Sequence, residues 1–197
     1  MNELTQWWVE RADPQAVAQT MWESWEAPHR FVIPLALKLL EPIGIGSVYE
    51  LGCGSGPNLR LLQKLVPGLP IGGSEPSPGL AGWASEHLGV HIDQTTLPEV
   101  PSDSWDVYLS CYTLAYVDPE DILTTLRGLN GRALILMEPQ GAGGLVNLTD
   151  IHGRRYGVPE YHHDYLALLP ESGWRMTWRW PLIQAVQGLS TVIIAER

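Results

Sequence analysis

The chain has 197 residues, 45% of them hydrophobic and 17% charged, which suits a single folded domain of about 100 to 200 residues and argues against disorder. Its 12 Lys and Arg against 22 Asp and Glu give a net charge of −10, a field that repels phosphate backbones and disfavours nucleic acid as a partner. With no apolar run of about 18 residues, no secretory signal and only two cysteines, the sequence predicts a cytoplasmic protein with no membrane span, disulfide framework or metal site.

Residues 1–43 have a helical pattern and predict an N-terminal helical cap, in which Asp13-Pro14 and Ala27-Pro28 can each start a helix. In residues 44–197, short apolar runs alternate with helical periods, as in a Rossmann-like core. The predicted strands are 47–51, 69–73, 90–93, 105–111 and 132–138, and the predicted helices are 57–66, 78–88 and 119–129. The fold class is therefore α/β, with a doubly wound, mostly parallel sheet.

The C-terminal part departs from this alternation. A predicted helix over 165–171 is followed by two strands in direct succession, 174–180 and 190–195. Two such strands cannot be joined by a right-handed β-α-β crossover. We therefore expect one of them to run antiparallel at the edge of the sheet.

A glycine-rich segment from Glu50 to Gly56 lies between the first predicted strand and a helix that Pro57 can begin. Glycines let a ligand approach the backbone N–H groups closely, and the helix N-terminus adds a positive partial charge. Pro57 stands where the dinucleotide fingerprint has its third glycine, which disfavours a nicotinamide-dependent reductase. No Lys-Ser/Thr pair follows the glycines, which excludes a P-loop.

Three acids are expected at the carboxyl edge of the predicted sheet. Glu75 follows the second strand, where doubly wound folds place an acid that bonds ribose hydroxyls. Asp93 ends the third strand and can bond an adenine amino group, and Glu50 ends the first. Such an acidic rim suits a ligand that carries positive charge and lacks phosphates.

These segments, in order, resemble the motifs of the class I S-adenosylmethionine-dependent methyltransferases. The motifs are Glu50 to Gly56, Glu75-Pro76-Ser77-Pro78, Asp93-Gln94-Thr95-Thr96-Leu97-Pro98 and Ser104-Trp105-Asp106-Val107. The resemblance covers roughly residues 47–138 and implies a seven-stranded sheet with an antiparallel last strand. It implies S-adenosyl-L-methionine as cofactor and S-adenosyl-L-homocysteine as product. The sequence departs from the family where the third helix of the alternation is short or missing, between Asp93 and Trp105.

The resemblance also assigns cofactor contacts. It implies that the glycine loop holds the methionine part, Glu75 the ribose, and Asp93 with the Gln94 backbone the adenine. The cofactor-binding residues predicted in the core are Glu50, Gly52, Cys53, Gly54, Gly56, Asn58, Glu75, Pro76, Asp93, Gln94, Ser110 and Cys111. In the cap, Trp25 could close as an aromatic lid and Arg30 could pair with the cofactor carboxylate; a cap that only packs on the sheet is the alternative.

The acceptor side has no universal catalytic residue, because methyl transfer depends mainly on holding donor and acceptor close and dry. A base is needed only if the acceptor must lose a proton. His162, His163 and Tyr116 are the catalytic candidates, and the alternative for each histidine is an exposed imidazole in a capping segment. Tyr112, Thr113, Gln140 and the loop 141–159 are further residues expected to line the acceptor site.

The sequence therefore predicts methyl transfer to a small-molecule acceptor by in-line displacement. Methylation of a protein or peptide side chain is one alternative, and a non-catalytic S-adenosylmethionine-binding accessory module is another. The run Ser110-Cys111-Tyr112-Thr113 replaces the Asn/Asp-Pro-Pro-aromatic run of the amino-methylating branch, so base amines are not the expected target. The acceptor and the oligomeric state stay open.

Overall fold

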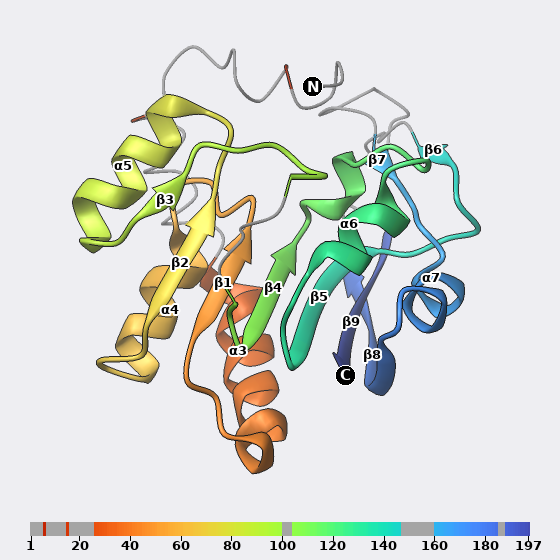
Figure 1. The fold of residues 1–197 in the computed structure, drawn as a ribbon, viewed down its shortest axis with the longest axis horizontal. Helices are drawn as coiled ribbons and strands as arrows, with labels where there is room; N and C mark the ends of the chain where they lie inside the picture. The colour runs from red at the N-terminus through yellow and green to blue at the C-terminus, as the bar shows by residue number, and fades with distance from the viewer. Residues whose placement is uncertain (1–5, 7–14, 16–25, 100–103, 147–159, 185–187) are drawn as a thin grey trace.

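A computed structural model of the chain describes residues 6, 15, 26–99, 104–146, 160–184 and 188–197. Its centre is a seven-stranded sheet with the strand order β3-β2-β1-β4-β5-β9-β8 (Figure 1). The strands are β1 Val48–Leu51, β2 Ile71–Ser74, β3 Ile92–Asp93, β4 Val107–Cys111, β5 Ala133–Pro139, β8 Arg175–Gln184 and β9 Gly188–Glu196. β1 to β5 pair in parallel, as the alternation of strands and helices predicts.

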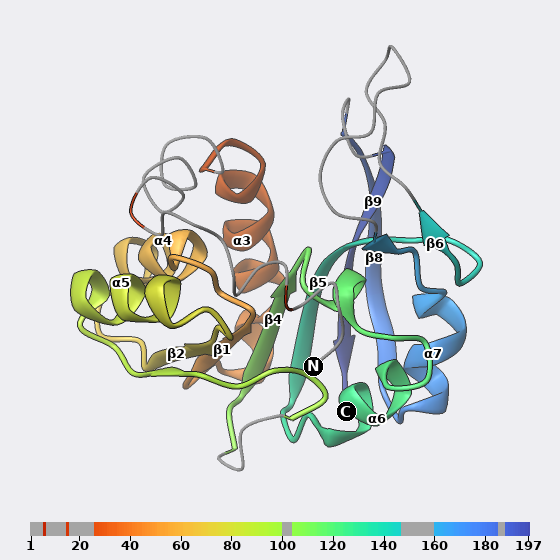
Figure 2. The same cartoon turned by 90° about the horizontal axis from the view of Figure 1, so that it is seen from above.

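Helices cover both faces of the sheet, which explains why β1, β4 and β5 are buried along their whole length (Figure 2). On one face α3 Glu26–Leu40, α4 Pro57–Leu65 and α5 Pro78–Leu88 pack against alternate strand residues such as Val107 and Leu109. On the other face α6 Ile122–Gly128 and α7 Tyr165–Glu171 pack against the intervening residues, such as Tyr108. The core is therefore two apolar layers separated by the sheet.

The last strand of the sheet is antiparallel, as predicted, but its position differs from the prediction. β9 pairs antiparallel with β5 on one side and with β8 on the other. The edge strand at this end of the sheet is thus β8, which runs parallel to β1–β5, and β9 lies inside the sheet. The cause is the crossover through α7, which leaves a gap beside β5 that the returning strand β9 fills.

Helix ends in the core follow their local sequence signals. α5 and α7 have the bounds that the sequence predicts, and Gly89, with φ +65°, ends α5. Asp164 begins α7 by accepting the backbone N–H groups of Leu166 and Ala167 at 3.1 and 3.3 Å. α6 begins at Ile122, three residues after its predicted start. The described residues between β3 and β4 contain no helix, in agreement with the gap expected there.

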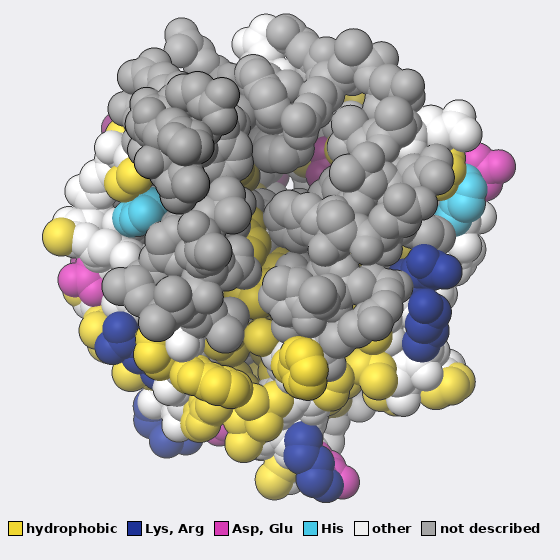
Figure 3. Space-filling model, turned by 180° about the vertical axis from the view of Figure 1, so that it is seen from behind, with side chains coloured by type: hydrophobic (Ala, Val, Ile, Leu, Met, Phe, Trp, Pro, Cys, Tyr) yellow, Lys and Arg dark blue, Asp and Glu magenta, His cyan; other side chains and the backbone are white. Residues whose placement is uncertain are grey.

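The described part of the predicted cap consists of α3 and the 3₁₀ helix η1 Glu41–Ile43. Ile33, Ala36 and Leu40 on α3 are buried against the sheet. Seen from behind, hydrophobic side chains gather on this side of the molecule (Figure 3). Phe31 on α3 is 79% exposed. Among the described residues, no helix has the length and apolar character to cross a membrane.

Smaller elements stand at the carboxyl end of β4 and β5. The 3₁₀ helix η2 Leu114–Tyr116 follows β4, and a two-stranded antiparallel sheet is made by β6 Leu145–Val146 and β7 Glu160–Tyr161. Gln140, directly after β5, forms a parallel bridge with His163. These contacts bring the segment before α7 to the same edge of the main sheet as the end of β4.

Candidate cofactor and acceptor site

The glycine loop turns sharply at the carboxyl end of β1. Gly52, Gly54 and Gly56 have φ values of +60°, +57° and +81°, a region that residues with side chains rarely adopt. The loop is tied to β2 by the Cys53 N–H, which donates to the Ser74 carbonyl at 2.8 Å. The sequence therefore needs glycine at three alternate positions to make this turn.

Two of these glycines are also needed for packing. A Cβ atom on Gly52 would lie 2.4 Å from Cγ2 of Thr113, and one on Gly56 would lie 2.5 Å from Cδ1 of Leu88. The loop thus packs between the turn after β4 and the end of α5. This packing fixes where its backbone N–H groups point.

Glu75, which the motif resemblance assigns to the ribose, bonds the backbone of the glycine loop. Its Oε2 accepts the Gly54 N–H at 3.0 Å and its Oε1 accepts the Ser77 N–H at 2.8 Å. Burial raises the pKa of Glu75 to about 7, although both N–H groups favour the carboxylate. An ionised carboxylate has about four acceptor positions, so two remain for hydroxyl donors such as those of a ribose.

Glu50, at the end of β1, is buried and only half satisfied. Its Oε1 accepts from Nδ2 of Asn58 at 2.6 Å, while Oε2 has no hydrogen-bond partner in the part of the chain that the structure describes. Burial raises the pKa of Glu50 to about 8; Asn58 opposes this rise and the charge of Glu75 adds to it. Asn58, predicted to bind the cofactor, therefore holds Glu50 in place. An orphaned carboxylate oxygen at this position favours a cationic or hydrogen-bond-donating ligand.

Asp93 completes the acidic rim at the end of β3. The hydroxyl of Tyr49 donates to its Oδ2 at 2.7 Å, and Nε2 of His91 lies 3.0 Å from its Oδ1. Tyr49 comes from the face of β1 opposite to the glycine-loop helix α4. The neighbouring Gln94 is exposed and Pro76 is partly buried.

Ser110 and Cys111 end β4, close to the glycine loop. Ser110 is fully buried and donates its hydroxyl to Oε1 of Glu138 at 2.7 Å. Cys53 and Cys111 are buried free thiols, and burial is the main cause that raises the pKa of each. Both thiols are therefore protonated and unreactive at neutral pH.

The structure separates the two histidines of the acceptor side. His163 is buried, and its Nε2 lies 3.1 Å from the carbonyl oxygens of both Leu114 and Val117. Burial lowers the pKa of His163, so the ring is neutral and Nε2 carries the proton that bonds these carbonyls. His163 thus fastens η2, and the alternative of an exposed imidazole does not apply to it.

His162 has a different environment. Its Nε2 lies 3.0 Å from Oε1 of Glu160, which is buried, while the His162 side chain is 18% exposed. Its backbone bonds Gly143 and Gly144, and a Cβ on Gly141 would lie 2.8 Å from Cβ of His162. A carboxylate on one ring nitrogen leaves the other nitrogen as an acceptor.

Other predicted site residues are placed less fully. Tyr116 is partly buried on η2, and Gln140 is partly buried with no described partner for its Oε1. Trp25 lies outside the described residues, and so does the loop 147–159. Arg30 is on α3, but its side chain is not among those described. The predicted lid thus stays a prediction.

Glu138 is the residue of this site that sequence reasoning missed. It lies at the end of β5, is fully buried and accepts four hydrogen bonds from the end of β4 and the turn that follows. Burial raises the pKa of Glu138 to about 7 against the effect of those donors. The sequence does contain a signal for it, because Glu138 is the one charged residue in the otherwise apolar strand β5.

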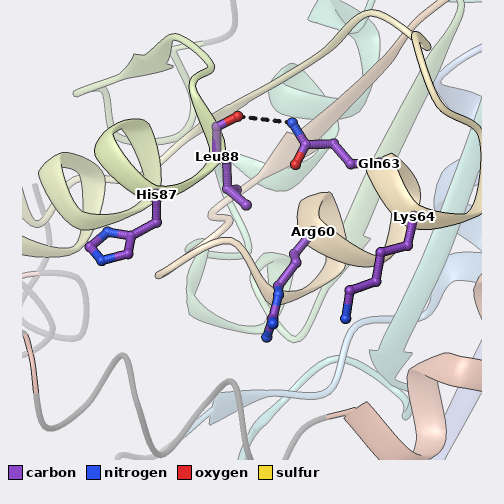
Figure 4. Close-up of a pocket in the computed structure, with 5 residues that line it drawn as sticks. All are labelled: Arg60, Gln63, Lys64, His87 and Leu88. Atoms are coloured by element: carbon purple, nitrogen blue, oxygen red, sulfur yellow. Dashed lines mark hydrogen bonds between the residues drawn. The ribbon is translucent and has the colours of Figure 1, made fainter.

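A pocket of about 370 Å³ lies between α4 and α5 (Figure 4). Its lining residues are Arg60, Gln63, Lys64, His87 and Leu88, and Nε2 of Gln63 donates to the Leu88 carbonyl at 2.9 Å. None of these residues belongs to the acidic rim. Its lining is basic and polar, and it shares no residue with the predicted cofactor site.

The sheet order defines a doubly wound α/β protein, and in such folds ligands bind at the carboxyl edge of the parallel strands, where the glycine loop and the acids lie. Comparison by sequence finds neither a protein family nor a curated protein that matches the chain. Comparison by structure finds many matches, several of them methyltransferases by name.

The magnesium protoporphyrin IX methyltransferase of Synechocystis, with bound S-adenosylmethionine, has a TM-score of 0.63 and 14% identity over 95% of this chain and 99% of that one. An amino pentose methyltransferase from Micromonospora echinaspora, also with S-adenosylmethionine bound, has a TM-score of 0.64 and 14% identity over 93% and 96%. An S-adenosylmethionine-dependent methyltransferase from Mesorhizobium loti has a TM-score of 0.61 and 19% identity over 83% and 96%. The chain has the fold of the S-adenosylmethionine-dependent methyltransferases, which confirms the fold that the motif resemblance implies.

Proposed function

We propose that the chain is an S-adenosylmethionine-dependent methyltransferase that acts on a small-molecule acceptor. The fold supports this proposal, and so do the named acceptors of similar structures, a magnesium porphyrin and an amino pentose. The net charge of −10 adds a reason against a nucleic-acid acceptor.

The observation that carries the proposal is the buried, half-satisfied Glu50 beside the glycine loop. A buried carboxyl oxygen with no hydrogen-bond partner is costly in a protein interior, so a ligand that brings a cation to Oε2 gains more here than at the surface. S-adenosylmethionine fits, because it brings an ammonium group and a sulfonium and has no phosphate for the three acids to repel. A nucleotide pyrophosphate would meet these acids and does not fit.

The chain's own residues have distinct parts in the proposed reaction. The glycine loop offers close backbone approach, Glu50 would hold the ammonium group, and Glu75 the ribose hydroxyls. When bound, S-adenosylmethionine supplies a methyl group that the acceptor's lone pair attacks in line, while the electrons of the carbon–sulfur bond pass to sulfur. Burial of Ser110 and Cys111 keeps water away from the β4 end.

For an acceptor that must lose a proton, His162 is the better placed of the two histidines. Glu160 on Nε2 would stabilise the imidazolium, and Nδ1 would take the proton. His163 has its Nε2 occupied by two carbonyls and is buried, so we assign it the role of fastening η2.

Calorimetric titration tests this proposal directly. The purified chain should bind S-adenosylmethionine and S-adenosylhomocysteine and should not bind NADH. Glu171→Gln, an exposed change at the end of α7, serves as the control that leaves binding unaltered. Binding of NADH alone, or of none of the three, would overturn the proposed function.

A further inference from the structure

Four donors converge on one buried carboxylate at the end of β5. Oε1 of Glu138 accepts the Ser110 hydroxyl at 2.7 Å and the N–H groups of Thr113 and Leu114 at 3.0 and 3.2 Å. Oε2 accepts the Ala115 N–H at 3.3 Å. Three successive backbone donors on one side chain fix the start of η2 much as a capping residue fixes a helix.

The turn that Glu138 holds begins with a strained residue. Tyr112 has φ +55°, which is an outlier for a bulky side chain. Its N–H donates to the Met137 carbonyl at 3.0 Å, and its hydroxyl donates to the Ser190 hydroxyl at 2.8 Å. Such a conformation persists only where the surroundings over-determine it, and these residues come from β5 and β9.

The same turn contacts the glycine loop. The hydroxyl of Thr113 donates to the Gly52 carbonyl at 3.2 Å, and its methyl group occupies the space that a side chain on residue 52 would need. A continuous path therefore runs from Glu138 through the Thr113 backbone and side chain to the loop.

We propose that Glu138 is a positioning residue, which holds the turn from Tyr112 to Tyr116 against the glycine loop and so couples the acceptor side to cofactor binding. This inference rests on the proposed function for its ligand. Glu138 acts through Thr113, and it contacts neither the predicted cofactor acids nor the exposed part of the site.

Glu138→Gln is the sharpest variant. An amide that keeps its oxygen at the Oε1 position places an NH₂ group against the Ala115 N–H, so that donor loses its acceptor. We expect amide hydrogen exchange at Ala115 to become about 10-fold faster or more, and the Kd for S-adenosylhomocysteine to rise about 10-fold. Glu171→Gln should change neither quantity.

Changes at Thr113 test the connection from Glu138 to the glycine loop independently. They keep the inference testable if Glu138→Gln does not fold. Thr113→Val removes the bond to Gly52 and should raise the Kd for S-adenosylhomocysteine, with hydrogen exchange at Ala115 unchanged. Thr113→Ser keeps the hydroxyl and should have wild-type affinity. The Glu138→Gln and Thr113→Val effects on Kd should be non-additive, because they interrupt one path.

Unchanged exchange at Ala115 in folded Glu138→Gln, or wild-type affinity in both Glu138→Gln and Thr113→Val, would overturn the inference. If the wild-type chain binds no S-adenosylhomocysteine, the proposed function fails, and the exchange measurement alone then decides whether Glu138 holds the turn.

Discussion

The two halves of the strand-end site are built in different ways. In the cofactor half, the glycine turn after β1 is built within a few residues: Gly52, Gly54 and Gly56 have positive φ values, and Asn58 bonds Glu50 from eight residues away. In the acceptor half, at β4 and β5, Glu138 binds Leu114 across 24 residues and His163 binds it across 49. The glycine turn of the cofactor half is thus set by neighbouring residues, while the turn of the acceptor half is held by residues from distant segments.

The largest expected effect on affinity comes from a change in the glycine turn. Gly54→Val places a β-branched residue at φ +57° and disturbs the N–H that Glu75 accepts. The Kd for S-adenosylhomocysteine should rise at least about 100-fold, since strain and a charged hydrogen bond are both involved. Wild-type affinity in a folded variant would remove the glycine loop from the site.

Glu75→Gln tests the charge of the cofactor half separately from its shape, because glutamine has nearly the shape of glutamate and carries no charge. One of the two backbone N–H groups would face an NH₂ group, and ribose hydroxyls would lose an anionic acceptor. We expect a loss of affinity of about 10- to 100-fold by calorimetry, the range of one or two hydrogen bonds to a charged group. A change of less than about 2-fold would contradict the assignment of Glu75 to the ribose.

The histidine pair distinguishes structural from chemical roles within the acceptor half. His163→Ala removes the donor that the Leu114 and Val117 carbonyls share and opens a cavity, so the free energy of unfolding should fall by about 2 to 4 kcal/mol in urea melts. His162→Ala should cost less stability, because His162 is partly exposed. Equal losses for the two variants would contradict the distinction.

Glu50→Gln tests the protonation of this acid through stability in the unliganded chain, where we expect a change in the slope of stability with pH. The folded pKa of about 8 lies above the usual 4.5, so folding keeps a proton that the unfolded chain releases. That group therefore makes the free energy of unfolding fall as pH rises from about 4.5 to about 8. The Gln variant should lose stability less steeply between pH 6 and about 8 in thermal melts; an unchanged slope would mean that Glu50 is ionised throughout.

This contrast also decides what could be predicted from the sequence. The glycine turn and the bounds of α5 and α7 depend on signals within a few residues, and the structure agrees with them. The edge position expected for the antiparallel strand was wrong, because strand order depends on which gap a returning chain fills. Glu138 was missed because its donors come from another strand, and sequence spacing alone did not separate His162 from His163.

The central claim is that two buried acids with raised pKa values receive the ammonium group and the ribose hydroxyls of an adenosyl ligand. With pKa values of about 8 for Glu50 and about 7 for Glu75, both ionise more fully when an ammonium group and hydroxyl donors arrive. Titration of S-adenosylhomocysteine at pH 7 in two buffers of different ionisation enthalpy measures the linked protons. We expect each bound ligand to release about one proton in total from the two acids, and the affinity to rise with pH up to about 8. Binding without proton release, or with proton uptake, would contradict the account.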